Sequence, residues 1–239
     1  MGIGVERVKT YIHNFDDYIQ GGVPKGHVIL ISGTPGTMKS SVCYSILYNN
    51  AKQHGIRSVY MTLEQSKENL LQQMELMGMN DPKVQEMVYV LDLATIRKNV
   101  TEMMAKGSWL QVFKMYAETV KKDLGFDLLV LDSLDVLEMA AQMTNDRRND
   151  LFYLFMWLRG MDITSFLIAE TSVDNINGGR FEEGYLADGV ISLKLQSIGE
   201  TDVQRRIRAV KLRSTDHKTG YFSLIFSDGM FRATQVINE

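Results

Sequence analysis

Residues 28–40 read Val28-Ile-Leu-Ile-Ser-Gly33-Thr-Pro-Gly-Thr-Met38-Lys39-Ser40. The apolar run at 28–32 predicts a buried strand, and the pattern over 40–53 predicts a helix. Between them lies a glycine-containing turn that closes with Lys39 and Ser40, which is the strand–loop–helix order of a phosphate-binding loop. The backbone N–H groups of such a loop point at one anion, and the helix adds its positive N-terminal end. We therefore predict that this loop binds the phosphates of a nucleotide.

The side chains of the loop suggest ATP, or a close nucleotide relative such as GTP, together with Mg²⁺. Lys39 is expected to place its charge on the β- and γ-phosphates, and the Ser40 hydroxyl is a hard oxygen ligand suited to Mg²⁺. The predicted nucleotide-binding set is Gly33, Thr34, Pro35, Gly36, Thr37, Met38, Lys39, Ser40 and Ser41. A chance glycine-rich turn is the alternative, and the combination of strand, Lys-Ser pair and helix disfavours it.

Met38 stands where the motif has glycine. Glycine at this position lets the backbone approach a phosphate without a Cβ atom. Met38 can still present its N–H group if its φ stays negative, because its side chain can point away from the phosphates. We expect methionine at this position to slow nucleotide hydrolysis more than it weakens nucleotide binding.

Two acidic residues follow other apolar runs. Asp132 ends the run 128–132, and we expect it to act on Mg²⁺ from the end of a neighbouring strand. Ser133 follows, and it could orient a water molecule or cap a turn. Glu64 follows the run 58–63 and could polarise water toward the γ-phosphate, or it could be a solvated acid at a helix start. The residues alone do not decide between these two roles of Glu64.

Strand-like and helical segments alternate along the chain. We predict strands at 28–32, 58–63, 87–91, 128–132 and 165–169, and helices at 40–53, 67–77, 108–122 and 146–159. Three further strands, at 189–195, 204–212 and 221–226, follow without intervening helices. This order predicts an α/β fold with a mostly parallel central sheet, helices on both faces and antiparallel strands at the C-terminal side. Ligands of such sheets bind at the carboxyl ends of the strands.

The composition limits the class of protein. The chain has 239 residues, a formal net charge of −3 and a single cysteine, Cys43. The length predicts one domain over residues 1–239, and a lone cysteine indicates a reducing, cytoplasmic setting. No run of about 18 apolar residues could span a membrane. The negative net charge disfavours a dedicated nucleic-acid binder.

Five motifs in a fixed order carry a family resemblance. They are Phe15-Asp-Asp-Tyr-Ile-Gln-Gly-Gly-Val-Pro-Lys-Gly, the loop 33–40, Leu63-Glu64-Gln65-Ser66, Glu183-Gly-Tyr-Leu-Ala-Asp188-Gly-Val and Lys211-Leu-Arg213-Ser-Thr-Asp-His217. Together they resemble the KaiC/RadA branch of the RecA superfamily of ATPases, and the loop resembles that of archaeal KaiC-like proteins. The resemblance runs over residues 5–235, nearly the whole chain.

The resemblance implies a RecA-like P-loop NTPase and assigns roles to several residues. The implied catalytic set is Glu64 as the base, with Lys39, Asp132, Lys211 and Arg213, and the implied metal site is Ser40 with Asp132. Lys211 and Arg213 would reach the γ-phosphate of a neighbouring subunit, which implies a homo-oligomer, commonly a hexameric ring. Three positions depart from the family pattern: Met38 and Ser214 replace glycines, and Gln65 replaces a frequent second acid.

The expected function is that of a slow, Mg²⁺-dependent ATPase whose nucleotide state switches an oligomer or a protein partner. A second hypothesis is a RadA-like recombination accessory that binds DNA through residues 140–149 and 173–183. Few aromatic residues lie there, and Glu182 and Glu183 oppose nucleic acid, so DNA binding is not favoured. A third hypothesis is a non-hydrolysing scaffold or a module that phosphorylates its own Ser or Thr.

Overall fold

The computed structural model describes residues 4–93, 95, 109–141, 143, 147–170 and 182–236. Its central feature is a nine-stranded sheet in the order β11-β10-β9-β8-β3-β7-β6-β4-β5, with a separate pair β1-β2 near the N-terminus. The strands are β1 (Arg7–Val8), β2 (Val23–Pro24), β3 (Val28–Gly33), β4 (Ser58–Thr62), β5 (Val88–Asp92), β6 (Leu128–Asp132), β7 (Thr164–Glu170), β8 (Gly189–Ile198), β9 (Asp202–Leu212), β10 (Phe222–Ser227) and β11 (Met230–Gln235). The predicted α/β class with a mostly parallel sheet is confirmed.

The strands from β8 to β5 pair in parallel. Every residue of β3, β4 and β6 is buried, because helices cover both faces of this part of the sheet. β3 lies between β7 and β8: Val28 pairs with Ser165, and Ile29 pairs with Gly189. The continuous apolar runs seen in the sequence are therefore the central strands.

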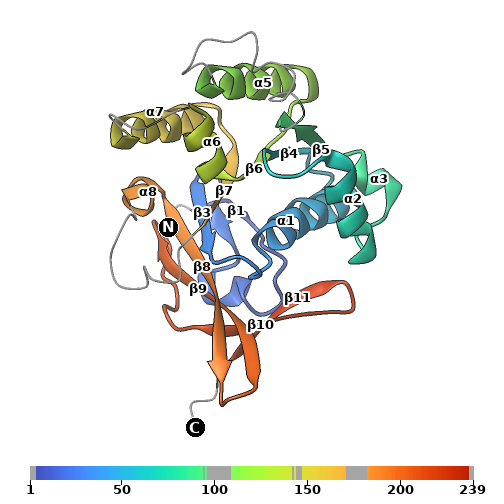
Figure 1. Cartoon of the computed structure of the whole chain (residues 1–239), viewed down its shortest axis with the longest axis vertical. Helices are drawn as coiled ribbons and strands as arrows, with labels where there is room; N and C mark the ends of the chain where they lie inside the picture. The colour runs from blue at the N-terminus through green and yellow to red at the C-terminus, as the bar shows by residue number, and fades with distance from the viewer. Residues whose placement is uncertain are drawn as a thin grey trace.

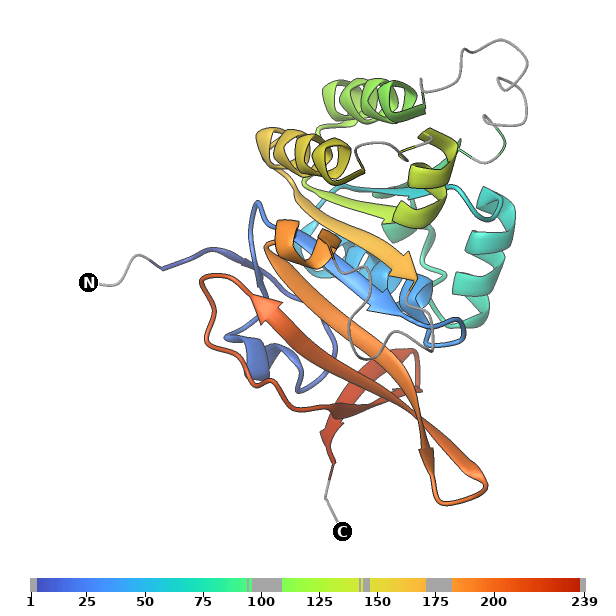
Figure 2. The same ribbon diagram turned by 60° about the vertical axis from the view of Figure 1, so that its left-hand side comes forward.

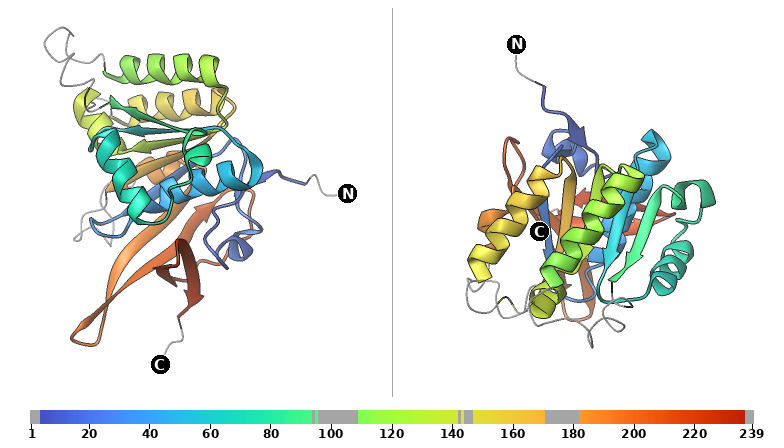
Figure 3. Two further views of the ribbon diagram at one scale, coloured as in Figure 1. Left: turned by 90° about the vertical axis from the view of Figure 1, so that its right-hand side faces the viewer. Right: turned by 90° about the horizontal axis from the view of Figure 1, so that it is seen from above.

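Helices form layers on the two faces of the parallel strands (Figures 1 and 3). The described helices are η1 (Asp16–Ile19), α1 (Lys39–His54), α2 (Lys67–Leu76), α3 (Pro82–Gln85), α5 (Trp109–Leu124), α6 (Leu134–Ala141), α7 (Arg147–Gly160) and α8 (Glu182–Leu186). One core cluster joins α1, α2 and α3 to the sheet, with Ile46, Leu70 and Val84 among its members. The other joins α5, α6 and α7 through residues such as Phe113 and Leu154.

The C-terminal strands extend the sheet in antiparallel fashion. β8 and β9 form a long hairpin with a register shift at Val190/Ile191, and β10 and β11 follow. Figure 2 shows this hairpin projecting away from the helical layers. The projection leaves one face of the hairpin without a covering helix among the described residues.

The structure adds elements that the sequence patterns did not predict. These are η1, α3, α6, α8 and the strands β1, β2 and β11. They are short or, for β11, depend on pairing with β10, so their hydrophobic periodicity is weak. None of the described helices is long and apolar enough to cross a bilayer.

Candidate functional site

The loop between β3 and α1 is tightly packed at its base. A Cβ atom on Gly33 would lie 2.5 Å from the Leu193 carbonyl oxygen and 2.9 Å from Thr37 Oγ1, so only glycine fits there. The Thr37 hydroxyl donates to the Thr34 carbonyl at 2.8 Å and ties the turn together. Pro35 and Gly36 form the exposed rim. The predicted strand–loop–helix arrangement is thus present.

Lys39 begins α1 and is buried. Its ammonium group donates to the carbonyl oxygens of Gly33, at 2.9 Å, and of Thr34, at 3.2 Å. These are neutral acceptors within the loop itself, and no described carboxylate forms an ion pair with Lys39. A phosphate group would be a stronger acceptor for the same cation.

The negative φ that was the condition for Met38 to present its N–H group is not found. Met38 caps α1 with φ 70° and ψ 30°, in the left-handed region. Its carbonyl accepts the first helical hydrogen bond from Val42 at 2.9 Å, so the chain must turn sharply here to enter the helix. Gly36, two residues earlier, also has a positive φ of 82°. The backbone therefore keeps the path that a glycine would take, and such alternating conformations direct successive N–H groups into an anion-binding concavity.

Parallel pairing aligns the strand ends at one edge of the sheet. Thr62 pairs with Asp132, and Gly33 pairs with Glu170. The residues that follow these positions therefore emerge side by side beside the loop. Glu64 and Asp132, far apart in the sequence, are brought together in this way, and the Leu63 N–H donates to the Asp132 carbonyl at 2.7 Å.

Asp132 is 2% exposed and is held by a partner that the sequence reasoning missed. The Tyr60 hydroxyl donates to Asp132 Oδ2 at 2.5 Å. Burial raises the pKa of Asp132, while hydrogen bonds from Tyr60 and Ser40 oppose that rise, and the nearby Glu64 charge adds to it. Tyrosine in a fully buried strand needs a polar partner, and this was the available signal.

Glu64 is exposed, in contrast to Asp132. The Ser133 hydroxyl donates to Glu64 Oε1, so the end of β6 holds the carboxylate that follows β4. Asp135, in the first turn of α6, is a further carboxylate near this edge that the sequence reasoning missed. It accepts from the Glu170 N–H at 2.7 Å, and its pKa is raised by burial and, to a smaller extent, by Glu64.

The donor set suits Mg²⁺ bound together with phosphates. Ser40 and Asp132 supply hydroxyl and carboxylate oxygens, the ligand types that Mg²⁺ prefers. No group of three or more His, Cys, Asp or Glu residues that could hold a metal occurs among the described residues. A metal here would consequently need phosphate oxygens and water to complete its ligands, as in P-loop sites.

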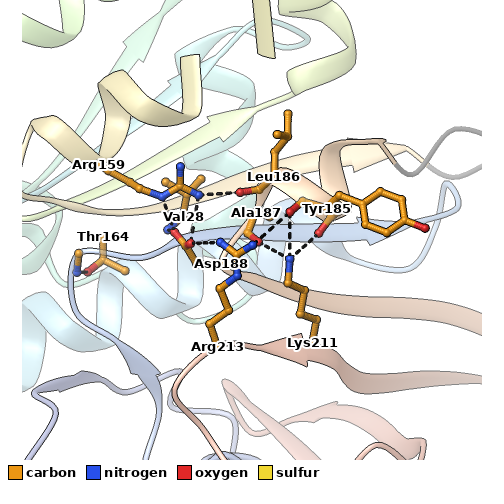
Figure 4. Close-up of polar contacts among 11 residues, drawn as sticks. Val28, Arg159, Thr164, Tyr185, Leu186, Ala187, Asp188, Lys211 and Arg213 are labelled. Carbon is orange, nitrogen blue, oxygen red and sulfur yellow. Dashed lines mark hydrogen bonds and ion pairs between the residues drawn. The ribbon is translucent and has the colours of Figure 1, made fainter. Parts of the chain in front are cut away.

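Lys211 and Arg213 lie away from this edge, near the start of β8 (Figure 4). Lys211 donates to the carbonyls of Gly184, Tyr185 and Ala187 at 3.0, 3.2 and 2.7 Å. Arg213 pairs with Asp188 at 3.0 Å and also donates to the Tyr185 carbonyl. Burial and the neighbouring Arg213 lower the pKa of Lys211. Within one protomer both cations therefore contact α8 and its following turn.

Asp188 is the centre of these contacts. Its carboxylate accepts from Arg159 at 2.9 and 3.0 Å, from Arg213 at 3.0 Å and from the Val28 N–H at 3.0 Å. It thus joins the end of α7 to the start of β3 and to the end of β9 (Figure 4). Asp188 lies in one of the five motifs of the family resemblance, and no role was predicted for it.

The two loops considered for DNA fall largely outside the described residues. In the first, positions 142 and 144–146 are outside, and in the second, positions 173–181 are outside. In the described remainder of these loops, Arg147 pairs with Glu138 at 2.7 Å and also with Glu183. Those contacts neutralise a charge that a nucleic acid would need.

Comparisons with known proteins agree with the motifs. The family described as "ATPase: KaiC" matches residues 8–232. A "UPF0273 protein" of Aeropyrum pernix is 30% identical over 224 residues, covering 89% of this chain and 87% of the relative. "Circadian clock protein KaiC2" of Synechocystis sp. is 26% identical over 92% of this chain, which spans only 38% of that relative's length.

A solved structure shares the fold. The crystal structure of a KaiC-like protein from Pyrococcus horikoshii superposes with a TM-score of 0.81, at 24% identity, over 97% of this chain and 100% of that one. The RecA-like arrangement predicted from the motifs is therefore confirmed.

Proposed function

The chain belongs to the KaiC ATPase family, and on this premise we propose that it binds ATP with Mg²⁺ and hydrolyses it slowly at a subunit interface. The nucleotide state then switches an oligomer, for which a hexameric ring is the proposed form. We propose that residues 1–239 act as a single ATPase domain, and the family match over residues 8–232 supports this assignment.

One observation carries the proposal. Lys39, Ser40, Asp132 and Glu64 come from three different segments and meet at one edge of the parallel sheet. These residues supply the groups that a nucleoside triphosphate site requires. They are an ammonium group, a hydroxyl group, one buried carboxylate and one exposed carboxylate. A structural role alone does not account for a buried lysine whose hydrogen bonds, within the described part of the chain, go to two carbonyls of its own loop.

The proposed mechanism gives each residue a separate role in ATP hydrolysis. Residues 33–41 bind the phosphates, with Lys39 on the β- and γ-phosphates. Ser40 and Asp132 would hold Mg²⁺, which spreads the charge that develops on the phosphate oxygens. Glu64 accepts a proton from the attacking water, and the Ser133 hydroxyl fixes its position. An exposed carboxylate suits this role because it can reach water that a buried one cannot.

Lys211 and Arg213 are proposed to act on the nucleotide of a neighbouring subunit. Their present acceptors are mostly neutral carbonyl oxygens of residues 184–187, which a phosphate would outcompete. The exposed side chain of Arg213 supports this assignment, since 52% of its surface is accessible despite the pair with Asp188. Nucleotide binding and subunit contact would thereby be coupled.

The test combines measurements of ATP turnover and of the mass of the oligomer. Phosphate release by purified protein in Mg-ATP is compared with that of Glu64→Gln, and light scattering gives the mass with ATP, with ADP and without nucleotide. We expect slow turnover that Glu64→Gln abolishes and a larger particle with ATP. Wild-type turnover equal to that of Glu64→Gln would exclude hydrolysis, and an intact-mass gain of about 80 Da would indicate self-phosphorylation instead.

A further inference from the structure

A cluster of cations lies on the face of the β8–β9 hairpin opposite the core residues Leu193 and Ile207. Lys194 on β8 pairs in register with Arg206 on β9, and Arg208 is two residues further along. Residues two apart in a strand share a face, so the three side chains lie on one side of the hairpin. Leu193 and Ile207, which alternate with them, belong to the core on the opposite side.

The ring of Tyr221 organises this cluster. Lys194 Nζ lies 4.1 Å from the ring centroid, and the Arg208 guanidinium carbon lies 4.5 Å from it. Cations at such distances are attracted to the ring by about 0.5–2 kcal/mol each. The ring therefore holds Lys194 and Arg208 close to each other without any ligand.

Nothing among the described residues neutralises these charges. No described carboxylate forms an ion pair with Lys194, Arg206 or Arg208, although the chain as a whole is acidic. Arg206 is only 6% exposed and makes no hydrogen bond with its side chain in the described structure, and Arg208 Nε is buried without a partner. Lys194 donates to Gln196 Oε1 at 2.8 Å, a neutral acceptor.

The cations also repel one another. Burial lowers the pKa of Lys194, and the charges of Arg208 and Arg206 lower it further. Gathering like charges in a partly buried place costs free energy unless an anion offsets them. The arrangement is that of a site built for a negatively charged ligand.

We propose that Lys194, Arg206 and Arg208 form a binding site for a phosphate-type oxyanion, separate from the Gly33–Ser40 loop. One arginine guanidinium group can donate two parallel hydrogen bonds to two oxygens of the same phosphate. This geometry favours phosphate over a monatomic anion such as chloride. The Tyr221 ring already carries two cations, so the site offers charge and not a stacking surface for a base. Free phosphate compounds fit it better than a single-stranded nucleic acid.

The site is independent of the proposed ATPase activity. Arg205, the neighbour of Arg206 on β9, donates to the Gly36 carbonyl at 3.2 Å. Because successive side chains of a strand point to opposite faces, Arg205 faces the P-loop and Arg206 faces away from it. A variant that lacks Lys39 therefore retains the whole cluster. This separation lets the two sites be tested one at a time.

Inorganic pyrophosphate is the probe, and full-length Lys39→Ala protein removes the contribution of the P-loop. We expect calorimetry to show one pyrophosphate site that weakens at least about tenfold, or ~1.4 kcal/mol, in Arg208→Gln and in Lys194→Gln. Lys122→Gln removes one exposed charge on α5 and is the matched control, with unchanged affinity expected. Wild-type protein whose P-loop is saturated with Mg-ADP should bind one pyrophosphate with the same affinity as Lys39→Ala.

Three outcomes would overturn the proposal. One is the absence of pyrophosphate binding to Lys39→Ala, or binding that neither Arg208→Gln nor Lys194→Gln weakens. Another is a single-stranded oligonucleotide that binds more tightly than pyrophosphate and is lost in Arg208→Gln, which would assign the cluster to nucleic acid. The third is a change of oligomeric mass in these variants with pyrophosphate binding unaltered, which would assign the cations to acids of a second copy. Circular dichroism of each variant checks its fold, and Lys194→Gln keeps the test valid if Arg208→Gln does not fold.

Discussion

The Tyr60 hydroxyl donates a 2.5 Å hydrogen bond to Asp132 Oδ2 across two neighbouring strands, at a point where both side chains are almost fully buried. The bond stabilises the ionised form of a carboxylate whose pKa burial would otherwise raise further. It also fixes which oxygen of Asp132 remains available to the loop. Tyr60 thus supports the acid that is predicted to act on Mg²⁺.

Tyr60→Phe should lower the free energy of unfolding by about 1–3 kcal/mol, because it leaves a buried carboxylate with one donor fewer. Urea unfolding near neutral pH measures the change. Tyr44→Phe is the matched control, since the Tyr44 hydroxyl is buried without a partner in the described structure and the ring lies 5.9 Å from that of Tyr60. Equal losses in the two variants would show that the hydrogen bond to Asp132 contributes nothing of its own.

Ser214→Gly should stabilise the protein by about 0.5–1 kcal/mol, because Ser214 holds a positive φ of 57° on an exposed turn. Met38→Gly removes the same kind of strain but also removes a side chain packed against the core, so its net effect should be smaller. Thermal or urea unfolding of both variants gives the comparison. A larger gain at Met38 than at Ser214 would contradict this argument.

Asp188→Asn should destabilise the protein by about 2–3 kcal/mol, because it leaves Arg159 and Arg213 without their common anion. The expected loss in free energy of unfolding is smaller than for a fully buried ion pair, because the side chains of Arg159 and Arg213 are 33% and 52% exposed. Glu6→Gln, which breaks the exposed Lys25–Glu6 pair, is the control and should cost less than about 1 kcal/mol. Similar losses in the two variants would argue against a central role for Asp188.

Stability should fall as the pH drops below about 6.5, and His27 should account for part of this fall. Burial lowers the pKa of His27 below its ordinary 6.5; the Arg159, Arg213 and Arg7 charges lower it further, and Asp188 opposes them. Because the unfolded chain takes up the proton first, folding loses free energy between pH 6.5 and the lowered pKa. His27→Gln should reduce that slope in urea unfolding measured at several pH values. An unchanged slope would exclude His27 as a contributor.

Ser133→Ala should reduce the turnover number several-fold while nucleotide affinity stays unchanged, since it frees the Glu64 carboxylate without touching the loop. Steady-state kinetics and fluorescent-nucleotide binding separate the two effects. Glu64→Gln should abolish turnover entirely, and a Ser133→Ala, Glu64→Gln double variant should be no worse than Glu64→Gln alone. An additional loss of affinity in Ser133→Ala would indicate that Ser133 contacts the nucleotide directly.

The central strands and the loop were predictable because their signals are local. An apolar run such as 128–132 is buried on both faces, and the Lys39-Ser40 pair follows such a run directly. The positive φ of Met38 was not predictable from its residue type, because the turn into α1 imposes it. Tyr60 and Asp188 were missed for another reason: their partners lie far away in the sequence, and only the sheet brings them together.

The place of β3 in the sheet has a consequence for how the protein is made. This strand carries the phosphate loop, yet its neighbours β7 and β8 begin only at residues 164 and 189. Contacts so distant along the chain form late and slowly. During translation the predicted nucleotide motif is therefore made before the two strands that hold β3 in the sheet, and the loop is expected to reach its folded geometry only after β8 has been made.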